Sequence, residues 1–203
     1  VLSDLSGALP ALQCADLVRF YVSVQSNTGA TFSDPPSAPS GFYEGLAANG
    51  VEVLYANDFE LGAGGFSVAN SPNLVNGTWQ RADPNGTVNT GEIAAPFTDA
   101  QSGAADFCYV TKQGAMLEPA GLNDVDGGPT DLISPPLDYQ GSDGTISFQA
   151  WVYSSGFDAL QVQVSGDGTN WFHVMNITAQ IGNTPNHTNQ WTQYSFAVGQ
   201  FLT

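Results

Sequence analysis

Short runs of alternating apolar and polar residues, separated by clusters of Gly, Asn, Asp and Pro, constrain this chain most strongly. In the run 17–24, apolar side chains alternate and β-branched and aromatic types dominate, which is typical of a β-strand. A turn at 27–29 and a short return strand at 30–33 follow, and the segment 34–39 contains three prolines that end regular structure. Residues 1–40 are therefore predicted to form a β-hairpin followed by a Pro-rich linker.

The rest of the chain shows the same kind of pattern. Turn signals separate nearly all of the further strand-like runs, which are 51–55, 66–68, 107–111, 130–133, 145–153, 160–164, 171–176 and 191–198. Since no long 3.6-residue period occurs, helix is expected only as isolated turns, for example at 42–48. We predict an all-β fold in which residues 41–203 form an antiparallel jelly-roll β-sandwich.

An isolated hairpin buries too little surface to be stable by itself, so the hairpin of residues 1–40 needs a partner. Its natural context is the end of an immunoglobulin-like domain, or a partner that supplies the other strands. Residues 1–4 show neither a starting Met nor the basic and apolar regions of a signal peptide. We therefore expect the sequence to be processed or cut from a longer chain.

The charge balance argues against two classes of binding partner. The chain has 3 Lys or Arg against 19 Asp or Glu among 203 residues, which gives a formal net charge of −16. Nucleic acids and anionic membranes both attract clustered Lys and Arg, so neither is an expected partner. No run approaches the roughly 18 apolar residues of a membrane span. The acidity favours cations as small partners, and the scarcity of sites for trypsin-like proteases suits a secreted, extracellular protein.

From Asn57 onward the sequence resembles the MAM-like jelly-roll modules of secreted bacterial proteins, including the C-terminal regions of immune-inhibitor-A-type metallopeptidases. The resemblance depends on the order of several motifs, which are Asn57-Asp58-Phe59-Glu60, Gly64-Gly65-Phe66, Trp79-Gln80-Arg81, Cys108-Tyr109-Val110-Thr111, Asn123-Asp124-Val125-Asp126-Gly127-Gly128, Leu132-Ile133-Ser134-Pro135, Ser165-Gly166-Asp167-Gly168 with Trp171, and Trp191. The segment 9–39 looks like the tail of the immunoglobulin-like segment that precedes such modules.

Two departures from the family pattern stand out. The aspartate turn after Asn123 has one Gly fewer than the usual form, and the sequence stops at Thr203, where similar modules continue into a final pair of strands. We therefore expect a sandwich that lacks its last strands.

The loop from Asn123 through Asp124 to Asp126 concentrates hard oxygen ligands before two glycines, as Ca²⁺ requires. The resemblance adds Asp58 and Glu60 as partner carboxylates, so these five residues are the predicted calcium ligands. The alternative is an ordinary Asx turn with solvated carboxylates. An EF-hand is excluded, because the loop lacks a Glu at the twelfth position and flanking helices.

The two cysteines are Cys14 and Cys108. An extracellular chain with one internal pair usually forms the disulfide, although either cysteine could instead pair with a segment outside this sequence. We predict a bond between Cys14 and Cys108 that ties the hairpin to the jelly roll. Four Asn-X-Ser/Thr sequons occur, at Asn76, Asn85, Asn176 and Asn186, and we interpret them as coincidental in an Asn- and Thr-rich chain.

Enzyme motifs are absent from the sequence. Its two histidines, His173 and His187, cannot build a paired-His metal site, and neither a Gly-X-Ser-X-Gly elbow nor a Walker-type loop occurs. Carboxylate pairs that a glycosidase would need exist, but acidic residues are too plentiful for such pairs to be informative. Residues 165–171 resemble an aspartate box, which we interpret as a structural hairpin turn with Trp171 in the core.

Three functions fit these observations. The favoured one is a non-catalytic structural or adhesive module of a surface protein or filament, which pairs with other protein subunits or neighbouring domains by strand exchange. The alternatives are an accessory domain of a secreted hydrolase such as a metallopeptidase, and a carbohydrate-binding module. For the last, Tyr139, Phe157 and Tyr194 could stack on glycans, although we favour the reading that they lie in the core or singly on the surface.

Overall fold

The computed structural model confirms an all-β chain. It describes residues 11–13, 16–47, 50, 52–101, 106–139, 144–154, 159–178, 180–181, 184–185 and 190–202. The strands are β1 (Leu17–Phe20), β2 (Val22–Gln25), β3 (Thr31–Asp34), β4 (Tyr43–Leu46), β5 (Ser67–Asn70), β6 (Trp79–Ala82), β7 (Thr87–Asn89), β8 (Glu92–Ala95), β9 (Cys108–Thr111), β10 (Thr130–Ile133), β11 (Thr145–Ala150), β12 (Ala159–Val164), β13 (Phe172–Thr178), β14 (Gln180–Ile181), β15 (Thr184–Pro185) and β16 (Thr192–Ala197). A 3-10 turn at Val198–Gln200 follows β16. Within the described ranges, no helix has the length and apolar character that a membrane span requires.

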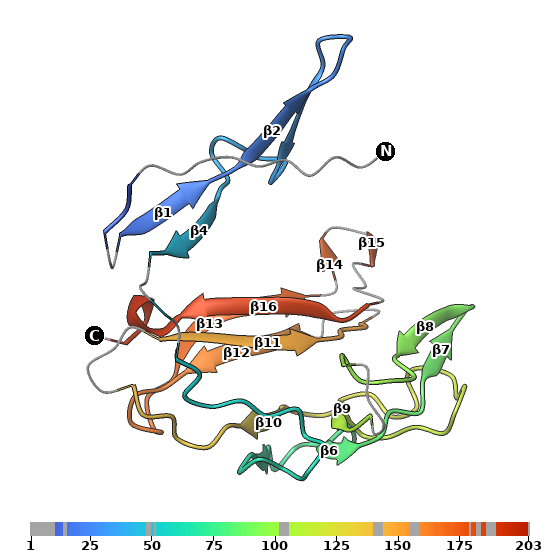
Figure 1. The fold of residues 1–203 in the computed structure, drawn as a ribbon. Helices are drawn as coiled ribbons and strands as arrows, with labels where there is room; N and C mark the ends of the chain where they lie inside the picture. The colour runs from blue at the N-terminus through green and yellow to red at the C-terminus, as the bar shows by residue number, and fades with distance from the viewer. Residues whose placement is uncertain are drawn as a thin grey trace. The chain divides into compact units, whose positions relative to one another are not determined.

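The chain divides into two compact units, Val1–Val53 and Leu54–Thr203 (Figure 1). In the first unit, β1 pairs antiparallel with β4, and β2 pairs antiparallel with β3. The hairpin of β2 and β3 closes through a turn in which the Ala30 amide donates to the Ser26 hydroxyl. The predicted hairpin is therefore present.

The helical turn expected at 42–48 is wrong, because Tyr43–Leu46 forms β4 instead. Its residues gain partners on β1: the Phe20 and Tyr43 rings lie 5.5 Å apart, and Arg19 Nε bonds Glu44 Oε1 over 2.6 Å. These cross-strand contacts outweigh a weak local helix preference. The first unit therefore extends past the Pro-rich segment at which we expected it to end.

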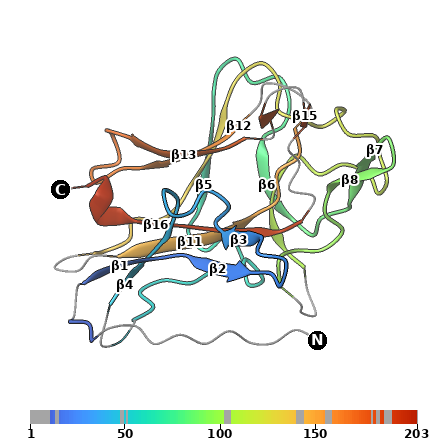
Figure 2. The same ribbon diagram turned by 90° about the horizontal axis from the view of Figure 1, so that it is seen from above.

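In the second unit the strands pair as β5 with β10, β6 with β9, β7 with β8, β11 with β16, and β12 with β13, all antiparallel. The pairs of β7 with β8 and of β12 with β13 are labelled in Figure 2. Buried Val164, Phe196 and Val198 form a core cluster, contributed by β12, by β16 and by the turn that follows β16. Leu160 and Val162 precede Val164 on β12 in an alternating pattern of burial, so β12 presents one apolar face to the core.

Two further sequence-based expectations need correction in this unit. Residues 52–55 form no strand, and Val53 is 72% exposed. The segment lies at the boundary between the two units and pairs with none of the described strands. Conversely, β6 (Trp79–Ala82), which pairs with β9, was not expected as a strand. All four of its residues are half-buried, so its sequence shows no alternation of apolar and polar residues.

Candidate functional site

The loop Asn57-Asp58-Phe59-Glu60 is bent by its own side chains. Asn57 Oδ1 accepts a hydrogen bond from the Phe59 amide over 2.6 Å, and Asp58 Oδ1 accepts one from the Glu60 amide over 3.1 Å. These are the short Asx-type contacts that stabilise tight turns. They let Phe59 adopt a φ of 67°, a left-handed conformation that is rare for an aromatic residue.

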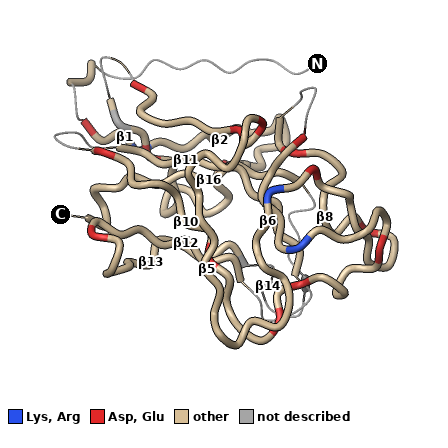
Figure 3. The backbone as a smooth tube through the Cα atoms, turned by 90° about the horizontal axis from the view of Figure 1, so that it is seen from below, with Lys and Arg blue, Asp and Glu red and all other residues tan. Residues whose placement is uncertain are grey.

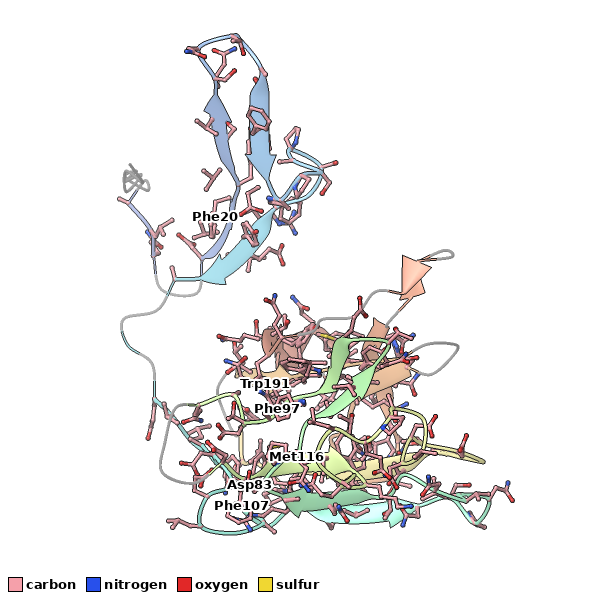
Figure 4. All side chains as sticks on the ribbon, turned by 90° about the vertical axis from the view of Figure 1, so that its right-hand side faces the viewer. Phe20, Asp83, Phe97, Phe107, Met116 and Trp191 are labelled. Atoms are coloured by element: carbon pink, nitrogen blue, oxygen red, sulfur yellow. The ribbon has the colours of Figure 1, made fainter. Side chains whose placement is uncertain are left out.

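Arg81 of β6 fixes this loop from the other side. Its Nε donates to the Phe59 carbonyl over 2.5 Å and its Nη2 donates to the Glu60 carbonyl over 2.9 Å. The guanidinium carbon also lies 3.8 Å from the centre of the Phe107 ring, a cation–π contact. Arg81 thereby connects the loop to β6 and to the segment that leads into β9. Asp83 and Phe107 are labelled in Figure 4.

Glu60 is consequently held in place with half of its carboxylate unsatisfied. Oε1 accepts a hydrogen bond from the Phe107 amide over 2.9 Å, whereas Oε2 is buried and has no hydrogen-bond partner among the described residues. A buried polar atom left without a partner costs about 1–3 kcal/mol, and more when the group is charged. A bound cation is one way to offset that cost, and Ca²⁺ prefers carboxylate oxygens.

Cys108 lies beside Glu60 in an acidic environment. Burial, and after it the negative charges of Asp99, Asp83, Glu60 and Asp106, together raise the pKa of its thiol to about 12. Asp99 is itself 7% exposed, and its Oδ1 accepts a hydrogen bond from the Gln101 amide over 2.8 Å. We call Glu60, Asp83, Asp99 and Asp106 the acidic cluster. No sequence pattern singled out its last three members. Asp106 is two residues before Cys108 in the sequence, whereas Asp83 and Asp99 come from separate segments that the fold brings near the thiol.

The predicted loop Asn123–Asp126 is held by different partners. The Asp126 amide donates to the Asn76 carbonyl over 3.2 Å, and Asn123 Nδ2 donates to Glu118 Oε2 over 2.7 Å. Gly77 allows the close approach of this loop, because a Cβ there would lie 2.5 Å from the Asp124 carbonyl oxygen. The loop is thus packed against the strand-like stretch around Asn76.

The predicted calcium ligands therefore fall into two loops, one with Asp58 and Glu60 and one with Asn123, Asp124 and Asp126. In the part of the chain that the structure describes, no three His, Cys, Asp or Glu side chains gather closely enough to hold a metal ion. Calcium also accepts backbone carbonyls and water as ligands, so fewer carboxylates suffice. Cys108 is a free cysteine in the structure, and its predicted partner Cys14 lies outside the described residues, so the disulfide stays a prediction.

The aspartate-box segment forms the predicted hairpin turn between β12 and β13. Asp167 Oδ1 accepts hydrogen bonds from the Thr169 and Asn170 amides over 2.8 and 2.7 Å, and Ser165 Oγ accepts one from the Gly168 amide over 2.9 Å. The expectation that Trp171 belongs to the core is wrong, since 44% of it is exposed. The strong local hydrogen bonds build the turn without needing the indole as an anchor.

Two of the other aromatic residues considered for glycan stacking, Tyr139 and Tyr194, are only half-exposed. Tyr139 packs against the core cluster, and Tyr194 stacks on Phe148 at 5.7 Å. Phe157 lies outside the described residues. Tyr139 and Tyr194 are thus accounted for by packing, as we favoured.

Comparisons of the chain with protein-family models, with curated proteins and with solved structures found no match. The structure defines an all-β protein of two units, and its candidate site is the buried Glu60 Oε2 near the buried Cys108 thiol.

Proposed function

We propose that the chain is a non-catalytic, extracellular structural or adhesive module whose jelly roll is stabilised by Ca²⁺ and whose first unit is completed by a strand from a neighbouring copy. The observation that carries the proposal is an apolar row on the first unit. Phe20, Val22 and Val24 alternate along β1 and β2, with Tyr43 opposite Phe20 and Phe32 opposite Val24. All five side chains are between 41% and 63% exposed.

Such a row is unusual on a free surface, because soluble proteins rarely leave contiguous large apolar side chains in water. The sheets of the first unit are two-stranded pairs, and pairs of that kind are marginal on their own. Their outer edges also present backbone groups that an added strand can bond. Strand addition by a neighbouring copy would supply backbone partners at an edge, and apolar side chains of that copy would pack on the apolar row.

The calcium part of the proposal is supported by Glu60. Its buried Oε2 lacks a partner among the described residues, and Asp99 and Asp106 lie close enough to act on the same thiol. Glu60 would hold the ion together with backbone carbonyls and water, and the negative charges of Asp99 and Asp106 would favour a cation there, in a chain of net charge −16. The ion has a stabilising role here and takes no part in a reaction.

The absence of catalysis is part of the proposal. His173, one of two histidines in the sequence, bonds Asn176 on the surface of β13. In this contact the imidazole faces a neutral side-chain amide. A general base instead takes a proton from a nucleophile or from a water molecule. Turnover of peptide or glycan substrates that a single point mutation abolishes would contradict this part.

Assembly can be tested by light scattering coupled to size exclusion, with Ca²⁺ present. We expect the wild type to form oligomers whose mass grows with concentration, and Val24→Asp to be monomeric. Ser23→Asp is the matched control, because Ser23 is adjacent and points to the opposite face of the same exposed strand, so it should assemble like the wild type. A wild type that stays monomeric at every concentration would overturn the assembly proposal.

A further inference from the structure

The four longest strand segments of the second unit carry no formal charge. Strands β11, β12, β13 and β16 contain no Asp, Glu, Lys or Arg, although the chain has 19 acidic residues. Figure 3 shows the red acidic positions on other parts of the tube. The face of β12 and β13 that points away from the core is thus a neutral surface on a strongly anionic protein.

Amide groups dominate that face. Gln161 lies opposite Asn176 in the register, and Gln163 lies opposite His173. The four side chains are hydrogen-bonded in a row: Gln163 Nε2 donates to Gln161 Oε1 over 3.1 Å, Gln161 Nε2 lies 3.5 Å from Asn176 Oδ1, and His173 Nε2 lies 2.9 Å from the same oxygen. We call these four residues the amide row.

The row is exposed and partly ordered before any ligand arrives. All four residues are exposed, and their mutual hydrogen bonds restrict the rotamers of long side chains. Ordering such side chains on binding otherwise costs about 0.5–1.5 kcal/mol each. A primary amide has two N–H donors and an oxygen with two lone pairs, so the row retains capacity for a ligand beyond these bonds.

An aromatic platform ends the row. Trp171 directly precedes β13 and stands two residues before His173, so it lies next to the end of the amide row. The turn that Asp167 stabilises directly precedes Trp171 and positions the backbone of Trp171. The Asp167 carboxylate accepts hydrogen bonds from the Thr169 and Asn170 amides of that turn. Its 44% exposure leaves indole surface for a ligand.

We infer that the amide row and Trp171 together bind a neutral polysaccharide. Sugar hydroxyls both donate and accept hydrogen bonds, which matches amide groups, and the C–H face of a pyranose ring packs on an aromatic face. An anionic polymer would need cations on this surface, and these strands carry none. The inference does not depend on the assembly of the first unit.

The test is affinity electrophoresis of the full chain in native gels containing β-glucan, xylan, mannan or galactan, with polygalacturonate as the anionic comparison. We expect at least one neutral polysaccharide to retard the wild type. Trp171→Ala should weaken that binding about tenfold, in line with about 1.5 kcal/mol for an aromatic contact. The double variant Gln161→Ala, Gln163→Ala should weaken it at least threefold.

The matched control is the double variant Gln149→Ala, Gln193→Ala, which removes a cross-strand amide pair from the exposed face of β11 and β16. It should bind like the wild type, as should Val24→Asp, while melting curves show that every variant is folded. Three results would each overturn the inference: no retardation by any neutral polysaccharide, retardation by polygalacturonate alone, or equal retardation of Trp171→Ala. A Trp171→Ala variant that changes oligomeric mass without sugar would assign the surface to a protein contact instead.

Discussion

Lys112 Nζ donates a hydrogen bond to Asn76 Oδ1 over 2.6 Å, and the side-chain nitrogen Nδ2 of Asn76 donates in turn to the Leu122 carbonyl over 3.0 Å. The side chain of one asparagine thus joins the end of β9 to the loop that precedes Asn123. The backbone of Asn76 also bridges to Asp126. Asn76 is therefore the residue that connects the predicted calcium loop to the sheet.

We expect Asn76→Ala to lower the free energy of unfolding by about 2 kcal/mol, because it removes two side-chain hydrogen bonds, one of them to a charged group. Lys112→Ala should cost about 1 kcal/mol, since Lys112 is exposed. Urea denaturation of the single and double variants measures the coupling, which should be near 1 kcal/mol. Fully additive effects would show that the Lys112 contact contributes nothing.

Calcium should raise the melting temperature of the wild type, and EDTA should reverse the rise. At a free concentration 100 times its dissociation constant, a ligand that binds only the native state stabilises it by about 2.7 kcal/mol. Glu60→Gln should abolish the rise and leave the calcium-free protein no less stable, because the buried charge is gone. Asp131→Asn, on the exposed side of β10, is the control.

Asp126→Ala in the same assay examines the loop that the sequence predicted. Loss of the calcium effect in this variant too would include the loop in the site, and retention would restrict the site to the acidic cluster. A wild type whose melting temperature responds to neither calcium nor EDTA would contradict the proposed site altogether.

In the reduced protein, the Cys108 thiol should be almost inert to iodoacetamide at pH 8. With a pKa of about 12, its thiolate fraction is roughly a thousandfold below that of an ordinary cysteine, and the thiol is also buried. Mass spectrometry after alkylation of native and of denatured protein measures the difference. Fast native alkylation would contradict the burial of Cys108.

The raised pKa also predicts a pH dependence of stability for the reduced protein. Between about pH 9 and the native value of about 12, the unfolded thiol loses its proton while the native thiol keeps it, so stability falls as pH rises through this window. Cys108→Ala should flatten that fall in a urea series. A disulfide to Cys14 would remove the effect in the oxidised protein, and a non-reduced digest identifies that bond directly.

Asp167 should stabilise its hairpin only while it is ionised. Hydrogen bonds from the backbone and side chain of Asn170 and from the Thr169 amide lower the pKa of this carboxyl below its usual range. The contribution is therefore complete above the ordinary Asp pKa near 4 and is lost as pH falls below it. Asp167→Ala should melt earlier than the wild type at pH 7, and the difference should shrink at pH 3. A constant difference would contradict the role of the charge.

Local patterns predicted the strands whose two faces differ. The run 160–164 became part of β12, because the alternating burial of that strand reflects one apolar face. β6 could not be predicted, since Trp79–Ala82 is half-buried throughout and its partner β9 lies far along the chain. The run 51–55 alternates in sequence, but its described residues 52–55 pair with no strand among the described residues, and a strand without a partner does not form.

The candidate site was predictable only where it is local. The Asn57-Asp58-Phe59-Glu60 motif drew attention to Glu60 because its residues are contiguous. Asp83 and Asp99 carried no signal, because in a chain with 19 acidic residues a single aspartate is unremarkable until the fold places it near Cys108. The exposure of Trp171 could not be predicted from the sequence either, because an aromatic residue beside a strand is most often part of a core.

The turn between β12 and β13 has a consequence for the order of folding. Its residues 165–171 join two strands that are neighbours in sequence, whereas β11 must find β16 and β5 must find β10 across long stretches of chain. Closing a short loop costs less entropy than closing a long one, and the hydrogen bonds of Asp167 and Ser165 need no tertiary contact. We therefore expect this hairpin to form first, so that Val162 and Val164 present the earliest apolar template on which β11 and β16 assemble.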